Sequence, residues 1–268
     1  MKIYLSQAKS ALNKSKLSNG GYTLNPYSGC PHGCQYCYNQ RFFNIIHPEK
    51  PWGTVLEIKT NLPEILNKEV KTKPRASVFL STITDPYNPQ EKQHKITRQC
   101  LEILLTNNWP VSVLTKSDLI LRDLDLFKNY LKNLEVGFTV TVLDNKIAKI
   151  LEPGAPVPSR RIAALQKLHQ NKIFTYVFVA PILPQITDLE KIIASTYKFA
   201  DEIWFDSLNT KLIKWPQFLA IIKNNFSNQW PFYQKFLTSD QKKYEAELKQ
   251  QIKNLAEKYK IKIKIMFC

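Results

Sequence analysis

From residue 54 onward the sequence alternates between short apolar runs typical of buried strands and longer stretches with helical periodicity. The runs "ASVFLST" at 76–82 and "FTYVFVAPIL" at 174–183 contain no charged residue, so we expect both faces of these strands to be covered. Such strands, separated by amphipathic helices, are typical of a parallel sheet. The predicted strands lie at 54–59, 76–82, 111–116, 135–143, 174–183 and 201–207.

The stretches between these runs have the spacing of amphipathic helices. One face of "ITRQCLEILLTNN" carries Ile96, Cys100, Ile103 and Leu104. About six strand–helix units predict an α/β fold, specifically a partial (β/α)6 barrel of the TIM type. The predicted helices lie at 62–70, 96–108, 118–133, 145–151, 159–170 and 188–200.

The tail differs from the rest, so we expect a barrel domain over 1–210 and a helical C-terminal extension over 211–268, packed on the barrel. Residues 214–225 and 239–260 are both predicted to be amphipathic helices. The last residues, "KIKIKIMF", alternate Lys with Ile, as in a strand with one face in water. The apolar stripe of the second helix consists of Tyr244, Leu248, Ile252 and Leu255.

The chain is strongly basic, with a net charge of +16 at pH 7 and a pI of about 9.5. Such a field attracts polyanions such as DNA or RNA, although a general Lys bias on a solvated surface also explains it. The N-terminus has no apolar signal region and no run is long enough to span a membrane, so we expect a cytoplasmic protein. The odd count of five Cys, three of them in one short loop, argues against a disulfide scaffold.

In barrels of this kind the chemistry lies where the strands end and the following loops begin. That rule selects the segments "STITDPYNPQE", "TKSD", "TVTVLD", "APILP" and "DSLN". Polar and charged residues are frequent in these segments. We therefore expect the functional residues among them.

The loop "NPYSGCPHGCQYCYNQRF" places three of the five Cys, Cys30, Cys34 and Cys37, within eight residues. A structural zinc site needs four ligands, and His32, squeezed between two of the Cys, is a poor fourth. A redox Cys-x-x-Cys pair leaves the third Cys unexplained. Three thiolates on a 4Fe–4S cluster leave one iron open, which implies catalysis.

Two further features of this loop suit a cluster. Gly29 and Gly33 permit the left-handed backbone that a loop wrapped around three ligands requires. Tyr36, directly before the third Cys, can place its ring near a bound ligand. These features favour the iron–sulfur interpretation over the other two.

The order of the motifs also carries a resemblance to a known family. Cys-x3-Cys-x-aromatic-Cys is the signature of the radical S-adenosylmethionine (SAM) enzymes. The segments "LNPYSGCPHGCQYCYN", "TDPYNPQE", "LTKSDLILRD", "LEPGAPVPSRRIAAL" and "APILPQITD" resemble, in order, the spore photoproduct lyase-like branch of that superfamily, often labelled DNA repair photolyases. The resemblance extends from about residue 10 to about residue 209.

The resemblance implies a 4Fe–4S cluster and SAM as cofactors, with Cys30, Cys34 and Cys37 as cluster ligands. The cluster would cleave SAM reductively to a 5′-deoxyadenosyl radical that abstracts hydrogen from a substrate. A reductant such as flavodoxin or ferredoxin would supply the electron. The oligomeric state is left open.

The same resemblance assigns residues to parts of SAM. Lys116 matches a Lys that meets the methionine carboxylate, and Thr84 and Asp85 match positions near its amino group. Thr139 or, by preference, Thr141 would reach the ribose. Tyr36 and the backbone at Ala180 would lie against the adenine.

Other residues of the motifs receive different interpretations. Arg122 and Asp123 lie in a predicted helix and are expected to be structural, whereas Glu152 and Arg161 are left open between ion pairing and substrate contact. Cys100 lies on an apolar helix face and is expected in the core. The role of Cys268, the last residue, cannot be read.

The sequence departs from spore photoproduct lyase in one respect, since the strand "SVFLST" lacks the hydrogen-donor Cys found there. The sequence therefore does not support the dimer-splitting reaction of spore photoproduct lyase. A radical SAM enzyme acting on nucleic acid is the first interpretation. A radical SAM enzyme acting on a peptide or small metabolite, and a non-catalytic iron–sulfur or zinc protein that binds nucleic acid, are the alternatives.

Overall fold

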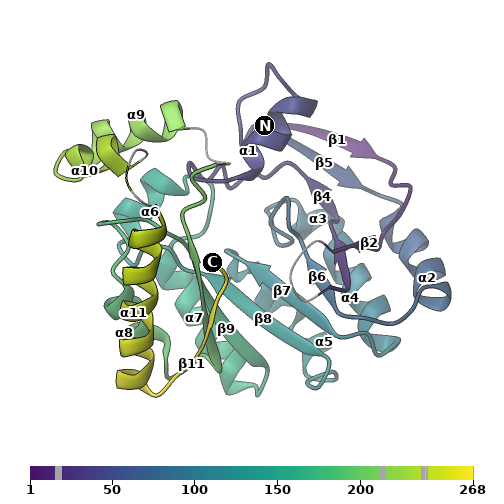
Figure 1. Cartoon of the computed structure of the whole chain (residues 1–268). Coiled ribbons are helices and arrows are strands. Elements are labelled where there is room, and N and C mark those ends of the chain that lie inside the picture. Colours follow the sequence, from purple (N-terminus) through teal and green to yellow (C-terminus); the bar gives the residue numbers. More distant parts are fainter. Residues whose placement is uncertain (16–19, 212–214, 237–238, 240, 268) are drawn as a thin grey trace.

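The computed structural model describes residues 1–15, 20–211, 215–236, 239 and 241–267 (Figure 1). Within these residues the chain forms an eight-stranded sheet and, beside it, a smaller three-stranded sheet. Helices pack around the larger sheet (Figure 1). Cys268 lies outside the described residues.

The main sheet has the order β11-β10-β9-β8-β7-β6-β3-β2 among the described residues. Neighbouring strands from β3 to β11 run parallel, whereas β2 pairs antiparallel with β3. Because β2 and β11 form its edges, the sheet is a partial barrel of the predicted α/β class. Its strands are β2 (Asn13–Lys14), β3 (Tyr22–Leu24), β6 (Val78–Leu80), β7 (Val111–Thr115), β8 (Leu134–Thr139), β9 (Phe174–Ile182), β10 (Glu202–Ser207) and β11 (Lys262–Ile265).

Helices connect the successive strands from β6 to β10, as the alternating pattern predicted. No helix in the described ranges is both long and apolar enough to cross a bilayer. The helices are α1 (Asn39–Ile46), α2 (Leu62–Thr72), α3 (Glu91–His94), α4 (Ile96–Thr106), the 3₁₀ helix η1 (Asp118–Asp123), α5 (Leu124–Phe127), α6 (Asn145–Leu151), α7 (Pro158–Gln170), α8 (Leu189–Thr196), α9 (Trp215–Asn225), α10 (Trp230–Phe236) and α11 (Gln241–Tyr259).

The prediction that 54–59 forms the first barrel strand was wrong. This segment is a strand, β5 (Val55–Lys59), but it lies between β1 (Lys2–Ser6) and β4 (Tyr27–Ser28) in the small sheet. The first parallel strand of the barrel is β3, which pairs with β6. β3 has three residues of mixed polarity, too few for its alternation to be recognised in the sequence.

The helix predicted over 118–133 is also shorter than expected. A 3₁₀ helix, η1, comes first and the four residues of α5 follow it. The Ser117 hydroxyl caps η1 by accepting a hydrogen bond from the Leu119 N–H at 3.3 Å. α10 was not predicted, because its seven residues are mostly aromatic and show no amphipathic period.

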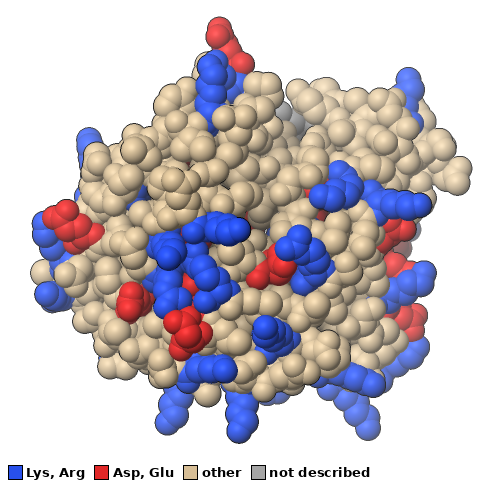
Figure 2. Space-filling model, turned by 180° about the vertical axis from the view of Figure 1, so that it is seen from behind, with Lys and Arg blue, Asp and Glu red and all other residues tan. Residues whose placement is uncertain are grey.

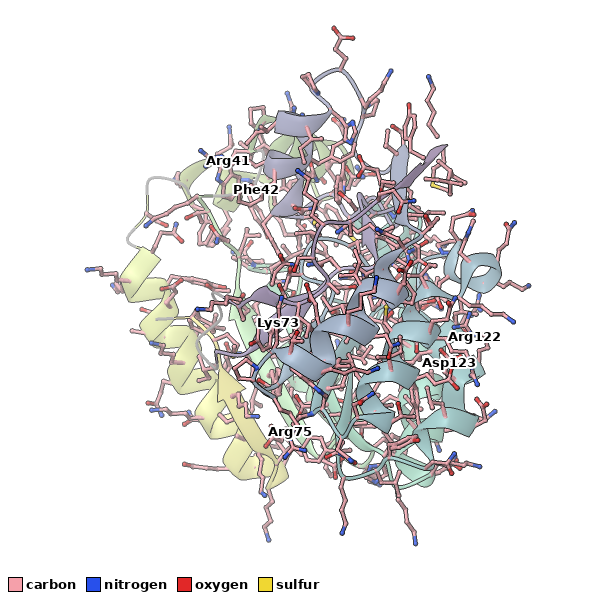
Figure 3. The ribbon with its side chains drawn as sticks, turned by 90° about the vertical axis from the view of Figure 1, so that its right-hand side faces the viewer. Arg41, Phe42, Lys73, Arg75, Arg122 and Asp123 are labelled. Carbon is pink, nitrogen blue, oxygen red and sulfur yellow. The ribbon has the colours of Figure 1, made fainter. Side chains whose placement is uncertain are left out.

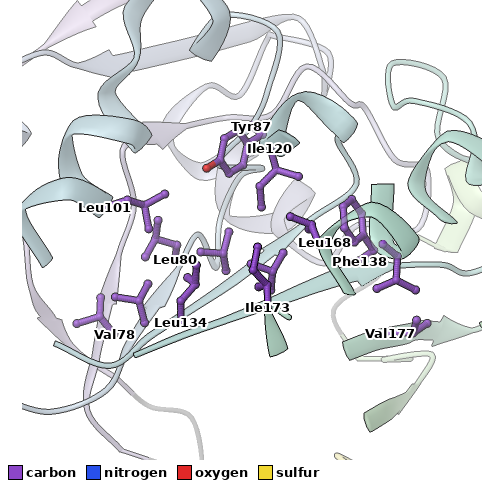
Figure 4. Packing of buried hydrophobic residues seen from close by; sticks show 14 of the residues in the cluster. Val78, Leu80, Tyr87, Leu101, Ile120, Leu134, Phe138, Leu168, Ile173 and Val177 are labelled. Carbon is purple, nitrogen blue, oxygen red and sulfur yellow. The ribbon is translucent and has the colours of Figure 1, made fainter. Parts of the chain in front are cut away.

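The hydrophobic core lies between the main sheet and the helices on its outer side (Figure 4). Val78 and Leu80 of β6 meet Leu101 of α4 there, and all three side chains are fully buried. Cys100 is fully buried in the same core, as its place on the apolar face of α4 predicted.

The inner side of the sheet is filled by aromatic rings. Trp204 of β10 stacks on Tyr176 of β9 with ring centroids 3.9 Å apart. A Cβ added at Gly137 would lie 2.1 Å from the Tyr176 ring, so only glycine fits opposite it. These rings lie along the strands, whereas the polar residues that could take part in chemistry lie at the carboxyl ends of the strands.

The C-terminal residues cover the sheet and also extend it. In α11 the predicted stripe faces inward, with Leu248, Ile252 and Leu255 buried. β11 then pairs parallel with β10, and its Lys side chains alternate with Ile as predicted for an edge strand.

Candidate active site at the carboxyl ends of the strands

The cysteine loop runs from the end of β4 to the start of α1. Gly29 (φ +76°) and Gly33 (φ +59°) adopt left-handed conformations, as the sequence predicted. A Cβ on Gly29 would lie 2.4 Å from the Val55 carbonyl oxygen, so the loop also approaches β5 too closely for another residue. The glycines therefore shape this loop.

The segment after α6 holds the cysteine loop in place. The Gln35 N–H donates to the Leu151 carbonyl at 2.8 Å, and the Gly154 N–H donates to the His32 carbonyl at 2.9 Å. A Cβ on Gly154 would lie 2.1 Å from the Pro31 carbonyl oxygen. The motif "LEPG" is thus the clamp of the cysteine loop, a role that the sequence could not reveal.

Cys30, Cys34 and Cys37 are free thiols, and the first two are buried. Burial raises the pKa of Cys30 to about 12, and the nearby Asp85 and Cys37 add to the effect. Burial also raises the pKa of Cys34 and of Cys37. No three His, Cys, Asp or Glu side chains in the described part of the chain are gathered as a metal site. Three free thiols in one glycine-shaped loop nevertheless fit the donor set of a cluster, whose binding would draw them together and displace their protons.

Tyr36 connects this loop to a buried ion pair. Its hydroxyl donates a hydrogen bond to Glu152, whose carboxylate pairs with Arg161. Arg161 also donates to the Thr139 carbonyl at 3.0 Å, and both members of the pair are buried. Burial alone would raise the pKa of Glu152, but the charges of Arg161 and Lys116 hold it below its usual value.

Two more of the predicted residues are connected to Tyr36. The Tyr36 hydroxyl lies 3.2 Å from the Thr141 hydroxyl, which donates to the Ala180 carbonyl at 2.9 Å. The structure thus brings together the two side chains and the one backbone carbonyl that the resemblance assigned to the adenosine part of SAM.

Asp85 joins the loop after β6 to the end of β7. Its carboxylate accepts hydrogen bonds from the Thr115 hydroxyl at 2.6 Å, the Lys116 N–H at 2.8 Å and the Tyr87 N–H at 2.9 Å. Nδ1 of His32 lies 3.4 Å from the same carboxylate. The hydrogen-bonding capacity of the Asp85 carboxylate is therefore largely used by groups of the protein itself.

Thr84, the neighbour of Asp85, contacts the cysteine loop directly. Its hydroxyl donates to the Gly29 carbonyl at 2.5 Å. Because a hydroxyl that donates one bond still accepts others, the Thr84 oxygen remains available to a ligand.

Lys116 lies above the ring of Tyr36, with Nζ 5.7 Å from the ring centroid. Burial by itself would lower its pKa, but the charges of Cys34 and Glu152 outweigh burial and raise it. Lys116 therefore remains a cation within the site. It is suited to bind an anionic group beside the cysteine loop.

Asp206 is a residue that sequence reasoning missed, although the segment "DSLN" was selected. It lies at the end of β10, and no cation pairs with it among the described residues. Burial, followed by the charges of Cys37 and Asp206, raises the pKa of Tyr38, which places Asp206 close to the cysteine loop. The signal in the sequence was a charged residue at the end of an apolar strand.

Arg122 and Asp123 lie in a different place (Figure 3). Arg122 pairs with Glu91 at 2.7 Å and with Asp123 at 2.7 Å, and the two carboxylates are fully buried. This network links η1 to α3, and it borders the site through Tyr27, whose hydroxyl donates to Glu91, and Tyr87, whose hydroxyl donates to Asp123. The geometry agrees with the structural role predicted for both residues.

Comparison with known proteins gives relatives over most of the chain. Residues 24–195 match the family model described as the radical SAM superfamily. An uncharacterized protein of Methanocaldococcus jannaschii is 36% identical over 225 residues, which cover 84% of this chain and 83% of that protein. A protein of Pseudomonas phage M6 named radical SAM Nα-GlyT isomerase is 27% identical over 170 residues, 62% of this chain and 34% of its own.

The fold has solved counterparts. A spore photoproduct lyase variant with bound AdoMet and dinucleoside spore photoproduct superposes with a TM-score of 0.72 at 14% identity, covering 98% of this chain and 81% of that one. This likeness confirms the partial barrel, and the family model confirms the resemblance read from the motifs. The chain is a radical SAM enzyme, and it belongs to the radical SAM superfamily.

Proposed function

We propose that the chain holds a 4Fe–4S cluster through Cys30, Cys34 and Cys37 and binds SAM beside it. When bound, this pair of cofactors supplies an organic radical by one-electron cleavage of SAM. The observation that carries the proposal is the presence of three free thiols in one loop at the carboxyl ends of the strands, with Lys116 over the ring of Tyr36 in that loop. The clamp formed by Leu151 and Gly154 would keep the loop in position.

The residues around the loop would orient SAM. Lys116 would bind the methionine carboxylate, because it remains a cation inside the site. Thr84 would accept a hydrogen bond from the amino group, and Asp85 would fix the backbone of Lys116. This division follows from the three hydrogen bonds that Asp85 already accepts.

The adenosine part would lie on the other side of the loop. Thr141 and Ala180 are held together by a hydrogen bond, and Tyr36 is fixed next to them by Glu152. These groups would hold the ribose and the base in one orientation. The protein thus contributes positioning, on which a radical reaction depends.

Anaerobic reconstitution tests this proposal. The protein is incubated with iron and sulfide, then with dithionite and SAM, and 5′-deoxyadenosine is measured by mass spectrometry. We expect it to form with the wild type and not with Cys34→Ala. A protein that binds zinc and forms no cluster would overturn the proposal.

For the substrate we propose nucleic acid. The net charge is +16, and Lys and Arg gather over the lower part of the face in Figure 2, with fewer Asp and Glu among them. A surface of this sign attracts phosphate backbones. The structural neighbour described above contains a dinucleoside, which is consistent with a nucleotide substrate in this fold.

A peptide or small metabolite is the second candidate, and Asp206 favours it. A carboxylate without a cation partner near the cysteine loop repels phosphate but accepts hydrogen bonds from amide or amine groups. Titration with single-stranded DNA and RNA at several salt concentrations separates the two candidates. Steeply salt-dependent binding, with added 5′-deoxyadenosine formation, supports nucleic acid; salt-independent or absent binding supports the second.

A further inference from the structure

Helix α1 and its N-cap residue Tyr38 present an exposed apolar face. Tyr38, Phe42, Ile45 and Ile46 have exposed fractions of 42%, 47%, 74% and 64%, and their spacing places them on neighbouring positions of one helix side. Single exposed apolar residues are normal on a protein surface, but a group of four on one short helix is typical of an interaction site. We call these four residues the α1 face.

The opposite side of α1 is anchored to the body of the protein. Phe43 is buried and packs edge-on against Trp52, with ring centroids 5.2 Å apart. The Gln40 amide donates to the Cys34 carbonyl at 2.9 Å. The helix is therefore held rigidly while its α1 face remains uncovered.

The α1 face lies next to the thiols. α1 begins two residues after Cys37, and the Tyr38 hydroxyl donates to the Thr82 carbonyl across the end of β6. Electron transfer rates fall steeply with distance, so a protein that reduces a cluster in this loop has to dock close to it. The α1 face is an exposed apolar surface directly attached to a ligand-bearing loop.

The charges favour an acidic protein as the partner. The chain carries +16, so a second copy of it is repelled, whereas an acidic protein is attracted. Arg41 is exposed beside Phe42 (Figure 3), and its guanidinium donates to the Lys211 carbonyl at 3.3 Å, which brings a second exposed cation to this edge. A face rich in Ile suits a protein surface better than a phosphate backbone.

We propose that the α1 face is the docking surface for an acidic protein that carries one electron, of the flavodoxin or ferredoxin class. This inference rests on the proposed function, because it requires a cluster in the cysteine loop. The step transfers one electron from the reduced carrier to the oxidised cluster, and no atoms are exchanged. The contact would be small and short-lived, as in other electron-transfer complexes.

The test compares two reductants on the reconstituted protein. Cluster reduction is followed by bleaching of visible absorbance in a stopped-flow instrument, first with dithionite and then with a fully reduced bacterial flavodoxin. In the variant Phe42→Ser/Ile45→Ser we expect the rate with flavodoxin to fall at least about tenfold, since a few central apolar contacts carry most of the binding energy of an interface. The rate with dithionite, which needs no docking surface, should not change.

Two control variants accompany the test. Leu131→Ser removes an exposed apolar residue (36% exposed) on another part of the surface and should leave both rates unchanged. Phe42→Leu/Ile45→Val keeps the face apolar and should retain most of the flavodoxin rate. Circular dichroism checks that each variant is folded.

The outcomes separate this inference from the proposed function. Equal flavodoxin rates in the wild type and in Phe42→Ser/Ile45→Ser would overturn the docking surface. A wild type that dithionite reduces but that neither flavodoxin nor ferredoxin reduces would overturn it as well, while the proposed function stands. A wild type without a cluster refutes the proposed function before any carrier is added.

Discussion

Two buried ion pairs in this protein are alike in chemistry and different in their neighbours. Glu152 pairs with Arg161 beside the cysteine loop, and Glu91 pairs with Arg122 between α3 and η1. The carboxylates of both pairs are almost completely buried. Each also accepts a hydrogen bond from a tyrosine, Tyr36 in the first pair and Tyr27 in the second.

The two networks differ in the residues that their hydrogen bonds and ion pairs reach. From Glu152 the contacts lead to Tyr36 in the cysteine loop and, through charge, to Lys116. From Glu91 they lead to Tyr27 in β4, to the Thr97 N–H at 2.9 Å and through Arg122 to Asp123, and none of these residues is assigned to the cluster or to SAM. A buried ion pair alone therefore does not identify a site; its direct contact with a residue assigned to the cofactor, here Tyr36, does.

The largest predicted effect comes from the loop that the first network supports. Cys34→Ala should abolish the cluster, seen as loss of broad visible absorbance after reconstitution, because a cube held by two thiolates is not retained. Cys100→Ala removes an equally buried thiol from the core and should keep the cluster. Full absorbance in Cys34→Ala would contradict the ligand assignment.

The two pairs can be compared directly with matched substitutions. Glu152→Gln leaves the buried Arg161 without its anion, which should reduce the free energy of unfolding by about 3–5 kcal/mol in urea denaturation. Glu91→Gln should reduce it less, because the Arg122 side chain is 20% exposed and keeps its pair with Asp123. Only Glu152→Gln should also weaken SAM binding to the reconstituted protein, because only Glu152 fixes Tyr36. Equal loss of SAM affinity in both variants would show that the two regions do not differ as described.

The contrast also explains what the sequence could predict. The alternating strand and helix pattern predicted the sheet from β6 to β10, and the strand-end rule selected the segments that contain Thr84, Lys116, Thr141 and Ala180, whose individual roles came from the family resemblance. These predictions rest on local sequence signals, namely periodicity and charged residues after apolar runs. Such signals can be read from the sequence without knowledge of tertiary contacts.

The missed features depend on tertiary contacts. Nothing local in β3 shows that it pairs with β6, or that β5 leaves the barrel for a separate sheet. The sequence left Glu152 and Arg161 open between ion pairing and substrate contact, and the structure pairs them, from the C-terminal end of α6 to the first turn of α7. The clamp of Gly154 on Pro31 joins residues far apart in the chain, so periodicity and propensity cannot report it.

A smaller effect is expected at Lys116, the cation between the cysteine loop and Glu152. Lys116→Ala should keep the cluster and weaken SAM binding by about 1–3 kcal/mol through loss of a charge-assisted contact, measured by titration of the reconstituted protein. Lys146→Ala, on the exposed start of α6, is the matched control and should have no effect. Unchanged affinity in Lys116→Ala would rule out its proposed role.

The smallest effect is expected at Asp206. This residue is the third carboxylate in the comparison, and unlike Glu152 and Glu91 it has no arginine partner among the described residues. Burial, with a contribution from Glu245, raises its pKa to about 6. A carboxyl whose pKa is raised in the folded state stabilises the fold below the pKa of the unfolded chain, and this stability is lost as the pH rises through about 6. Asp206→Asn stays neutral, so it should be more stable than the wild type by about 2 kcal/mol at pH 7.5, after allowance for the water that still reaches the group. Near pH 4 the two proteins should be equally stable. Urea denaturation at both pH values measures the difference in the free energy of unfolding between Asp206→Asn and the wild type. If this difference is the same at both pH values, Asp206 is solvated like a surface carboxylate, and its burial near the loop does not change its pKa.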